Sequence, residues 1–398
     1  MDLAIKDVRR HAGKFAATVV GVGLLLSIVL TMNGIYRGNI ADGVWLIDNT
    51  AADLWVVERG RGGPFNEPSR IAEERYRSVA AVPGVAGASP FLTYSAQREI
   101  GGKSRQFSVV GYDALGGLGG PRRIASGNPI RAAHFEIVAD AKLGLRVGER
   151  ARLGLHDYEV VGLTKGAVDT GGNPLVYMAL PDAQEVLYQQ DNEAIRSSRA
   201  ASLRALEAQG YARAEAERLL LATAGDTHAI SAVLVRLAPA ADAARVRAAI
   251  EERLFLNVYT SGEERQLMIE GRLMKATATL GLFRTLLVIV SVVIMSLVVY
   301  ILTMEKIRAL ATLKLIGAPN RIIARLILEQ SLALAVLGFA TAYALVALTH
   351  ARFPRTLVFE TSDTLATFVV IFAGGVMSSL FGIWRALRAP ASLALGGG

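Results

Sequence analysis

The stretch Glu305-Lys-Ile-Arg-Ala-Leu-Ala-Thr-Leu-Lys-Leu-Ile-Gly-Ala-Pro319 decides how this chain is organised. It is short, amphipathic and charged, and it lies between two long apolar runs, Thr285–Met304 and Gln330–Thr349. Each run has about 20 residues without a charge, enough to cross a hydrocarbon layer of about 30 Å at a rise of 1.5 Å per residue. The pattern predicts a short helix that a span on either side holds at a membrane surface, where a soluble partner can reach it.

Two further apolar segments, Phe15–Ile35 and Thr364–Trp384, have the same length and lack of charge. The first is longer than the apolar core of about 7–15 residues in a signal peptide, so we expect an uncleaved span. Between the first and second spans lies a long interval of ordinary soluble composition. The expected fold is an α-helical membrane protein with four transmembrane helices and a large α+β extracytoplasmic domain inserted between the first and second.

The distribution of basic residues gives an expected orientation. Lysine and arginine precede the first span (Lys6, Arg9, Arg10, Lys14), lie between the second and third spans (Lys306, Arg308, Lys314, Arg321, Arg325) and follow the fourth (Arg385, Arg388). By the positive-inside rule, both termini and the 305–321 segment are cytoplasmic and the long interval is outside. The basic residues of these cytoplasmic flanks contribute to the net charge of +8 and are expected to interact with membrane lipids. No nucleic acid partner is expected. The chain has no cysteine, which excludes disulfides and Cys-ligated zinc.

The alternation of apolar residues and turn residues divides the chain further. Strands are expected at 52–57, 85–97, 105–112, 135–138, 151–155, 158–163, 174–178, 228–237 and 256–259, and helices at 69–82, 181–222 and 240–254. The expected divisions are an amphipathic N-terminal helix (1–14), a first span (15–35), an outer domain (36–262) with a barrel or sandwich subdomain near 130–225, a stalk helix continuous with the second span (263–304), a cytoplasmic helix (305–321), a third span (322–349), an outer loop (350–363), a fourth span (364–384) and a tail (385–398).

Catalytic constellations are not evident in the sequence. The five histidines are scattered without ligand spacing, so we expect no metal site. The string Gly101-Gly-Lys-Ser104 has Gln97 where a phosphate-binding loop needs its first glycine, and a β-turn is expected there instead. We therefore expect no catalytic or cofactor residue in this chain. The spans carry few polar residues away from their ends, which argues against a channel or an ion-coupled carrier.

The signature Glu305-x-x-x-Ala309-x-x-x-Leu313-Lys314-x-Ile316-Gly317-Ala318 resembles that of the FtsX/MacB-type ABC transporter permeases. The string Ala386-Leu-Arg388-Ala-Pro390 after the last span is similar to the C-terminal motif of the same family, and so is a large outer domain between spans one and two. The outer-domain segments 135–163 and 174–178 also resemble it. The layout, without a fused ATPase, looks closest to the DevC-type subgroup.

This resemblance implies a mechanotransmission (type VII) permease of the bacterial inner membrane, working as a dimer with a separate ATPase that holds ATP and magnesium. Motion would pass through the stalk to a periplasmic domain that works with an adaptor (a membrane fusion protein) and an outer-membrane duct. Lipoprotein or lipid extraction, as in LolC-type permeases, and control of a cell-wall hydrolase are alternatives within the family. The resemblance assigns coupling to the ATPase to Glu305, Arg308, Ala309, Leu310, Leu313, Lys314, Ile316, Gly317 and Ala318, and a C-terminal motif to Arg388 and Pro390.

Two alternatives stay open from the residues themselves. The chain could be a membrane-anchored sensor or scaffold, and 305–318 could be a plain amphipathic linker. The string Gly317-Ala-Pro319 favours a fixed helix end, which an indifferent linker does not need. For a dimer, small residues on the stalk (Gly281, Ser291, Ser296), together with the first span, are the expected interface, because small side chains let helices approach closely in lipid. The cargo is not specified.

Overall fold

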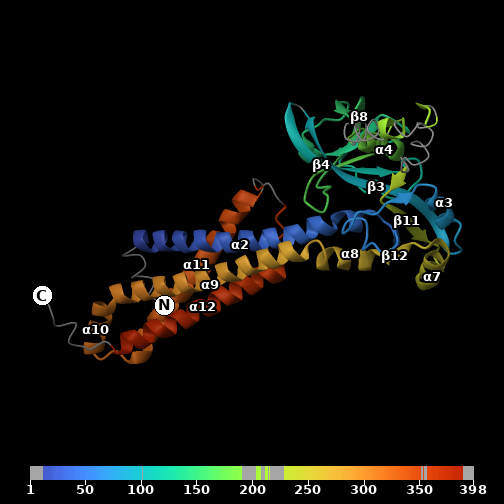
Figure 1. Ribbon diagram of the computed structural model, residues 1–398. Coiled ribbons are helices and arrows are strands. Elements are labelled where there is room, and N and C mark those ends of the chain that lie inside the picture. The colour runs from blue at the N-terminus through green and yellow to red at the C-terminus, as the bar shows by residue number, and fades with distance from the viewer. Residues whose placement is uncertain are drawn as a thin grey trace. The chain divides into compact units, whose positions relative to one another are not determined.

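The computed structural model describes residues 12–100, 102–190, 203–207, 211–213, 215, 228–350, 353 and 356–388. The chain forms two compact units, one made of Met1–Asn39 with Lys275–Gly398 and the other of Ile40–Met274. Within the described residues, four helices are long and apolar enough to cross a membrane. The α+β unit is inserted between the first and second of them, so the expected fold class is confirmed (Figure 1).

The helical unit packs its long helices around a buried apolar core. Its helices are α2 (Ala12–Asn49), α9 (Met274–Glu305), α10 (Ile307–Leu315), α11 (Asn320–Thr349) and α12 (Thr361–Arg388). Leu26, Met295, Leu334 and Ile371 belong to one buried cluster and come from α2, α9, α11 and α12 in turn. The Ser331 hydroxyl donates to the Gly375 carbonyl at 2.8 Å, which satisfies a polar group between α11 and α12 inside the apolar core.

A glycine groove on α2 holds the segment that precedes α12. A Cβ atom on Gly38 would overlap the Thr356 carbonyl oxygen, and one on Gly34 would come within 2.8 Å of the Phe359 ring. Arg37, between these glycines, pairs with Asp363 and with Glu360, the latter at 3.1 Å. Gly34 and Gly38 therefore let the segment before α12 approach α2 closely, and the ion pairs of Arg37 lie beside this contact.

Helix α2 is longer than the span predicted over 15–35, since it continues to Asn49. Val44, Leu46 and Ile47 keep apolar residues at helical spacing and are buried in the α+β unit, which begins at Ile40. The last turns of α2 therefore belong to the unit that was expected as the outer domain from residue 36.

The expected continuous stalk over 263–304 is wrong. Helix α8 (Ser261–Glu270) ends at Gly271, and α9 begins only at Met274. Gly271 has a non-helical backbone (φ −89°, ψ −91°), and the Leu273 N–H reaches back to the Met268 carbonyl at 3.0 Å. Leu273 is buried in the core of the α+β unit, so tertiary packing of this side chain accounts for the break.

The α+β unit is built on one large sheet. Among the described residues, ten strands form it in the order β12-β1-β11-β3-β4-β9-β6-β8-β5, with β7 paired to β8. A two-residue pair, β10 with β2, stands apart. The strands are β1 (Leu54–Val57), β2 (Ile71–Ala72), β3 (Val85–Ile100), β4 (Lys103–Tyr112), β5 (Ser126–Gly127), β6 (Glu136–Asp140), β7 (Arg150–Leu153), β8 (His156–Thr164), β9 (Leu175–Ala179), β10 (Ala229–Ile230), β11 (Ala232–Leu237) and β12 (Asn257–Thr260).

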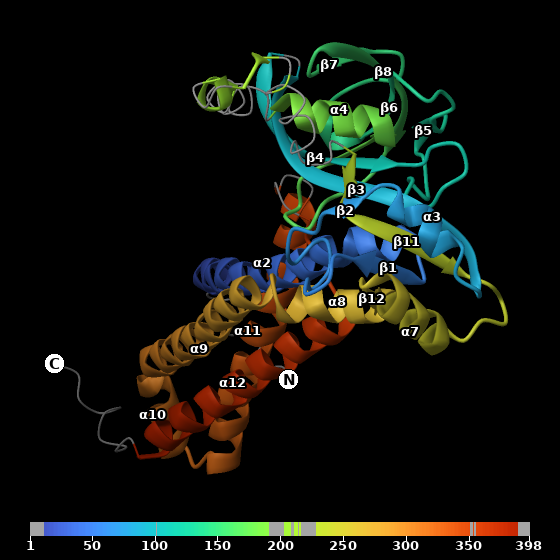
Figure 2. The same cartoon turned by 45° about the vertical axis from the view of Figure 1, so that its right-hand side comes forward.

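The middle strands do not form the separate barrel or sandwich that their short lengths suggested. Strand β9 pairs with β4 in parallel and with β6 antiparallel, so β6 to β9 extend the same sheet (Figure 2). The predicted β-α-β return is present as β11, α7 (Ala243–Leu254) and β12, with β1 inserted between its two strands. Turn spacing predicts where strands occur, but it does not specify which strand pairs with which.

Alternate side chains of β1 enter two different cores, because successive residues of a strand face opposite sides of a sheet. Leu54 and Val56 pack with residues of α3 (Arg75–Ala80), α4 (Leu180–Gln190) and α7. Trp55 packs on the other side with Leu46 and with Met268 of α8. The Trp55 ring makes edge contacts with Phe65 and Phe91 at centroid distances of 5.3 and 5.6 Å. The sheet is thus covered on both faces.

Other sequence expectations have mixed outcomes. The helix expected over 69–82 is instead strand β2 followed by the short helix α3. Helix α4 begins the expected helical region 181–222, and most of the remainder lies outside the described residues, as does nearly all of the expected N-terminal helix.

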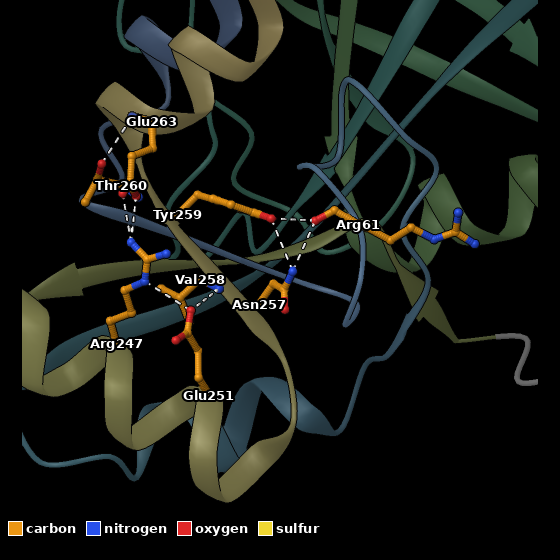
Figure 3. A network of polar contacts seen from close by, with 8 residues as sticks. All are labelled: Arg61, Arg247, Glu251, Asn257, Val258, Tyr259, Thr260 and Glu263. Atoms are coloured by element: carbon orange, nitrogen blue, oxygen red, sulfur yellow. Dashed lines mark hydrogen bonds and ion pairs between the residues drawn. The ribbon is translucent and has the colours of Figure 1, made fainter. Parts of the chain in front are cut away.

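A capping box joins β12 to α8 (Figure 3). The Thr260 hydroxyl accepts from the Glu263 N–H at 3.1 Å, and the Glu263 carboxylate accepts from the Thr260 N–H at 2.8 Å. Arg247 of α7 donates to the same carboxylate at 2.8 Å. The hydrogen bond from the Thr260 N–H and, to a smaller extent, that from Arg247 hold the pKa of Glu263 below its usual range. The box fixes where α8 starts and which way it leaves the sheet.

Thr260→Ala is expected to lower the free energy of unfolding of the α+β unit by about 1 kcal/mol, because the Glu263 N–H loses its acceptor. Thr260→Ser keeps a hydroxyl at that position and should retain most of the stability. Denaturant midpoints of the full chain in detergent measure the difference. Equal midpoints for the alanine and serine variants would show that the cap contributes nothing.

Candidate functional site

Helix α10 and the turn after it form the first candidate site. Helix α9 ends at Glu305, Lys306 makes the corner, and α10 runs from Ile307 to Leu315 before α11 begins at Asn320 (Figure 1). The predicted 305–321 helix is therefore shorter than expected, and Glu305 belongs to the preceding span. The two ends of α10 therefore connect to long helices, through Lys306 on one side and through residues 316–319 on the other.

The end of α10 has the geometry that Gly317-Ala-Pro319 predicted. Gly317 has φ +92°, a left-handed backbone that glycine adopts without a side-chain penalty. The Ala318 N–H donates to the Leu313 carbonyl at 3.0 Å and the Gly317 N–H to the Lys314 carbonyl at 3.2 Å, which together make a Schellman cap. Pro319 then stands at the N-cap of α11.

One face of α10 packs inside the helical unit. Leu310 is buried with Ile323 and Ile327 of α11, and Leu313 and Ile383 pack against this cluster. The Lys306 ammonium donates to the Gln330 side chain at 3.2 Å. The inner face of α10 is therefore packed against both α11 and α12.

The other face of α10 is open. Among the predicted coupling residues, Glu305, Arg308 and Ala309 are exposed, and Lys314 and Ala318 are half-buried. Ile316 is 79% exposed and the neighbouring Leu315 47% exposed, so two apolar side chains protrude beside the glycine turn. The family pattern did not single out Leu315. Its position beside Ile316 at a capped helix end is the signal that could have revealed it.

Comparison with known proteins places both parts of the chain in one family. The model of the MacB-like periplasmic core domain matches residues 15–253, and that of the FtsX-like permease C-terminal region matches residues 281–391. The chain belongs to the MacB/FtsX family of ABC transporter permeases.

Uncharacterized ABC transporter permeases of Mycobacterium bovis and Mycobacterium tuberculosis are 23% identical over 394 residues, which is 99% of this chain and 99% of theirs. The crystal structure of the periplasmic region of MacB from Actinobacillus actinomycetemcomitans aligns at 10% identity and a TM-score of 0.34, over 57% of this chain and 96% of that one. The extracellular domain of YknZ, from Gram-positive bacteria, aligns at 11% identity and a TM-score of 0.32, over 52% and 99%.

Membership of this family identifies the chain as the membrane permease component of an ABC transporter, which implies an ATPase partner. The string Gly101-Gly-Lys-Ser104 fits that division of labour. Lys103 and Ser104 begin strand β4, whereas a phosphate-binding loop is followed by a helix. Gly101 itself lies outside the described residues.

Among the dimer residues predicted in this permease, Ser291 needs correction. Ser291 is 2% exposed and donates to the Leu287 carbonyl within its own helix, so it faces the core of its own helical unit. Gly281 and Ser296 are half-buried, and their part in a dimer stays a prediction. The outward face of α9 is instead large and apolar (Leu282, Phe283, Leu286, Ile289, Val293, Leu297). In the C-terminal motif, Arg388 ends α12, while its side chain and all of Pro390 lie outside the described residues.

The permease also contains a buried acid that sequence reasoning missed. Glu264 of α8 is 0% exposed, and neither of its carboxylate oxygens has a hydrogen-bond partner in the part of the chain that the structure describes. It lies against Gly63, where a Cβ atom would overlap both oxygens. Burial raises the pKa of this carboxyl to about 8. Glu263, next to it in sequence, is paired and half-exposed, so no local pattern marks Glu264 as different.

Proposed function

We propose that this permease transmits ATP-driven motion from a separate ATPase, through α10, to its α+β domain. The observation that carries the proposal is the construction of α10. Its inner face is locked to α11 and α12 by the Leu310 cluster, while Leu315 and Ile316 protrude at a capped end. An exposed apolar side chain on a rigid element is the kind of anchor that a partner's pocket takes up.

The orientation belongs to the same proposal. The basic residues around α10 support a cytoplasmic position for it, where an ATPase dimer would bind, and a position of the α+β domain on the opposite side of the inner membrane. A second copy of the chain completes the transporter. The family resemblance supports a periplasmic adaptor and an outer-membrane duct as further partners, and export or extraction of periplasmic or lipid-type cargo as the outcome.

Affinity purification of the full chain from its native host in mild detergent, with an ATP hydrolysis assay, tests the proposal. We expect an ABC ATPase in stoichiometric amount and hydrolysis that requires it. An adaptor or lipoprotein in the same preparation would indicate the pathway. A clean chain without an ATPase in several detergents would contradict the proposal and favour a sensor or scaffold.

A further inference from the structure

A glycine-rich segment of the α+β unit covers the buried carboxyl of Glu264. The segment Gly60-Arg-Gly-Gly-Pro64, called the flap below, belongs to the loop between β1 and β2, which contains no helix or strand. A Cβ atom on Gly63 would overlap both Glu264 oxygens, so the carboxyl occupies the space that a side chain at this position would need. Gly60 and Gly63 have φ angles of +81° and +89°, which glycine adopts without strain. Glycine therefore lets the main chain of the flap lie directly on the acid.

Polar contacts hold the flap closed (Figure 3). The Tyr259 hydroxyl of β12 donates to the Arg61 carbonyl at 2.9 Å, and the Asn257 side chain reaches the same oxygen at 3.5 Å. The Gly62 N–H donates to the Glu67 carboxylate at 3.3 Å. Within the flap itself, no apolar side chain is buried. A segment that few exposed hydrogen bonds hold, without an apolar anchor of its own, can open locally while the rest of the unit stays folded.

Under the closed flap, Glu264 meets no group that would stabilise its charge. It is 0% exposed, and the described residues offer no hydrogen bond to either of its oxygens. Strands β1 and β12, which contact α8, carry no charged residue, and Tyr259 is the titratable group on β12. The charged side chains on the surrounding elements are exposed or paired with one another. They are Glu263, Arg265 and Glu270 of α8, Arg272 after it, Asp48 of α2, Arg247 of α7, and Glu58, Arg59, Arg61, Glu67 and Arg70 of the loop.

Opening the flap changes the protonation of this acid. Burial raises the pKa of Glu264 to about 8 in the closed form, so the carboxyl holds a proton there at neutral pH. Water that reaches an opened site returns its pKa toward the ordinary value of 4.5, at which the group is ionised at neutral pH. Opening therefore releases one proton, and each pH unit between the two values favours the open form about tenfold.

The loop that carries the flap also contacts the break between α8 and α9. A Cβ atom on Gly271 would come within 2.5 Å of the Asn66 side chain, so the loop lies directly against this glycine. Arg272, the next residue, donates to the Phe65 carbonyl at 2.9 Å. Opening that spreads along the loop would therefore loosen the connection that leads into α9.

We propose that the flap is a proton-controlled cover, closed while Glu264 is protonated and opening, with release of that proton to solvent, as the pH rises. The permease would thereby adjust the α8–α9 connection to the pH of the solution around its α+β unit. The inference rests on contacts within the α+β unit alone, so it does not depend on whether α10 binds an ATPase.

Hydrogen exchange of the full chain in lipid nanodiscs, measured from about pH 5 to about pH 8, tests the proposal. The amides of Arg61 and Gly62, which donate within the loop, report flap opening once their rates are corrected for intrinsic exchange. Their opening constant should rise about tenfold per pH unit in the parent and should not change with pH in Glu264→Gln. Amides of the central strand β9 serve as the reference and should be protected far more strongly.

Three further variants separate the acid from the flap. Gly63→Ala places a Cβ atom on the carboxyl and should hold the flap open at every pH. Tyr259→Phe removes the hydroxyl that holds Arg61 and should raise the opening constant severalfold at each pH while the tenfold slope remains. Glu67→Gln, an exposed change in the same loop, still offers Gly62 an acceptor and is the matched control that should behave like the parent.

Three results would overturn the proposal. An opening constant that is independent of pH in the parent would show that Glu264 has a polar partner in solution. The same pH dependence in the parent and in Glu264→Gln would assign the effect to another group. Protection of Arg61 and Gly62 equal to that of β9 would show that Glu264 becomes exposed only when the whole unit unfolds.

Discussion

Glu264→Gln is expected to raise the free energy of unfolding of the α+β unit by about 3 kcal/mol at pH 7 and to flatten its pH dependence between pH 5 and 8. The carboxyl is fully buried, the described residues offer it no hydrogen-bond partner, and its pKa rises to about 8 from an ordinary value of 4.5. Between these two values the unfolded chain is ionised while the folded chain must hold a proton. Each pH unit in that window then destabilises the folded state by about 1.4 kcal/mol.

The sign of the effect can be checked at both ends of the window. Below about pH 4.5 the group is protonated in both states, so the variant and the parent should be equally stable. Above about pH 8 both states are ionised, so the difference should stop growing. Because glutamine is neutral and nearly the same shape, it leaves the packing against Gly63 intact.

The measurement is the denaturant midpoint of the full chain in detergent. Unfolding is monitored by the fluorescence of Trp55 in a background with Trp45→Phe and Trp384→Phe. Trp55 is fully buried in the core that α8 covers, so its emission reports unfolding of this region. Glu270→Gln, an exposed change on the same helix, is the matched control and should have little effect. A parent curve that is already flat from pH 5 to 8 would show that Glu264 has a polar partner in solution.

The contrast between Glu264 and Gly317 shows what the sequence can predict. Gly317 is part of a local signal, a glycine and a proline after a short amphipathic stretch, and the Schellman cap follows from those residues alone. The four spans are likewise local, since length and lack of charge are sufficient to identify them. These two local features were predicted correctly, whereas the helix expected over 69–82 was not.

The remaining errors arise from contacts between distant residues. The break before α9 exists because Leu273 enters a core that residues from 46 to 234 build. Ser291 was assigned to a dimer because it is small, whereas its burial depends on how α9 is rotated against the other helices. The order of the strands and the unpartnered carboxylate of Glu264 depend on the same kind of information, which no window of sequence contains.

Ile316→Asp is expected to lower the affinity of the chain for its ATPase at least tenfold and to reduce coupled ATP hydrolysis to a similar extent. Ile316 is 79% exposed, so its replacement removes no contact that holds the permease together. Burying an isoleucine side chain in a partner's pocket is worth about 2 kcal/mol, and every 1.4 kcal/mol lost is tenfold in affinity. An aspartate in the same pocket adds the penalty of an unpaired buried charge.

Two controls make the result specific to this position. Ile316→Val keeps an apolar side chain and should retain most of the binding, whereas Leu155→Asp makes the same kind of change at a 68% exposed position on the α+β unit and should bind the ATPase like the parent. Gly317→Trp tests the neighbouring turn, because a side chain at φ +92° strains the cap that directs Leu315 and Ile316 outward. Full ATPase binding by both the Ile316→Asp and the Gly317→Trp variants would contradict docking at the end of α10. It would favour docking at the exposed residues near the start of the helix, Arg308 and Ala309.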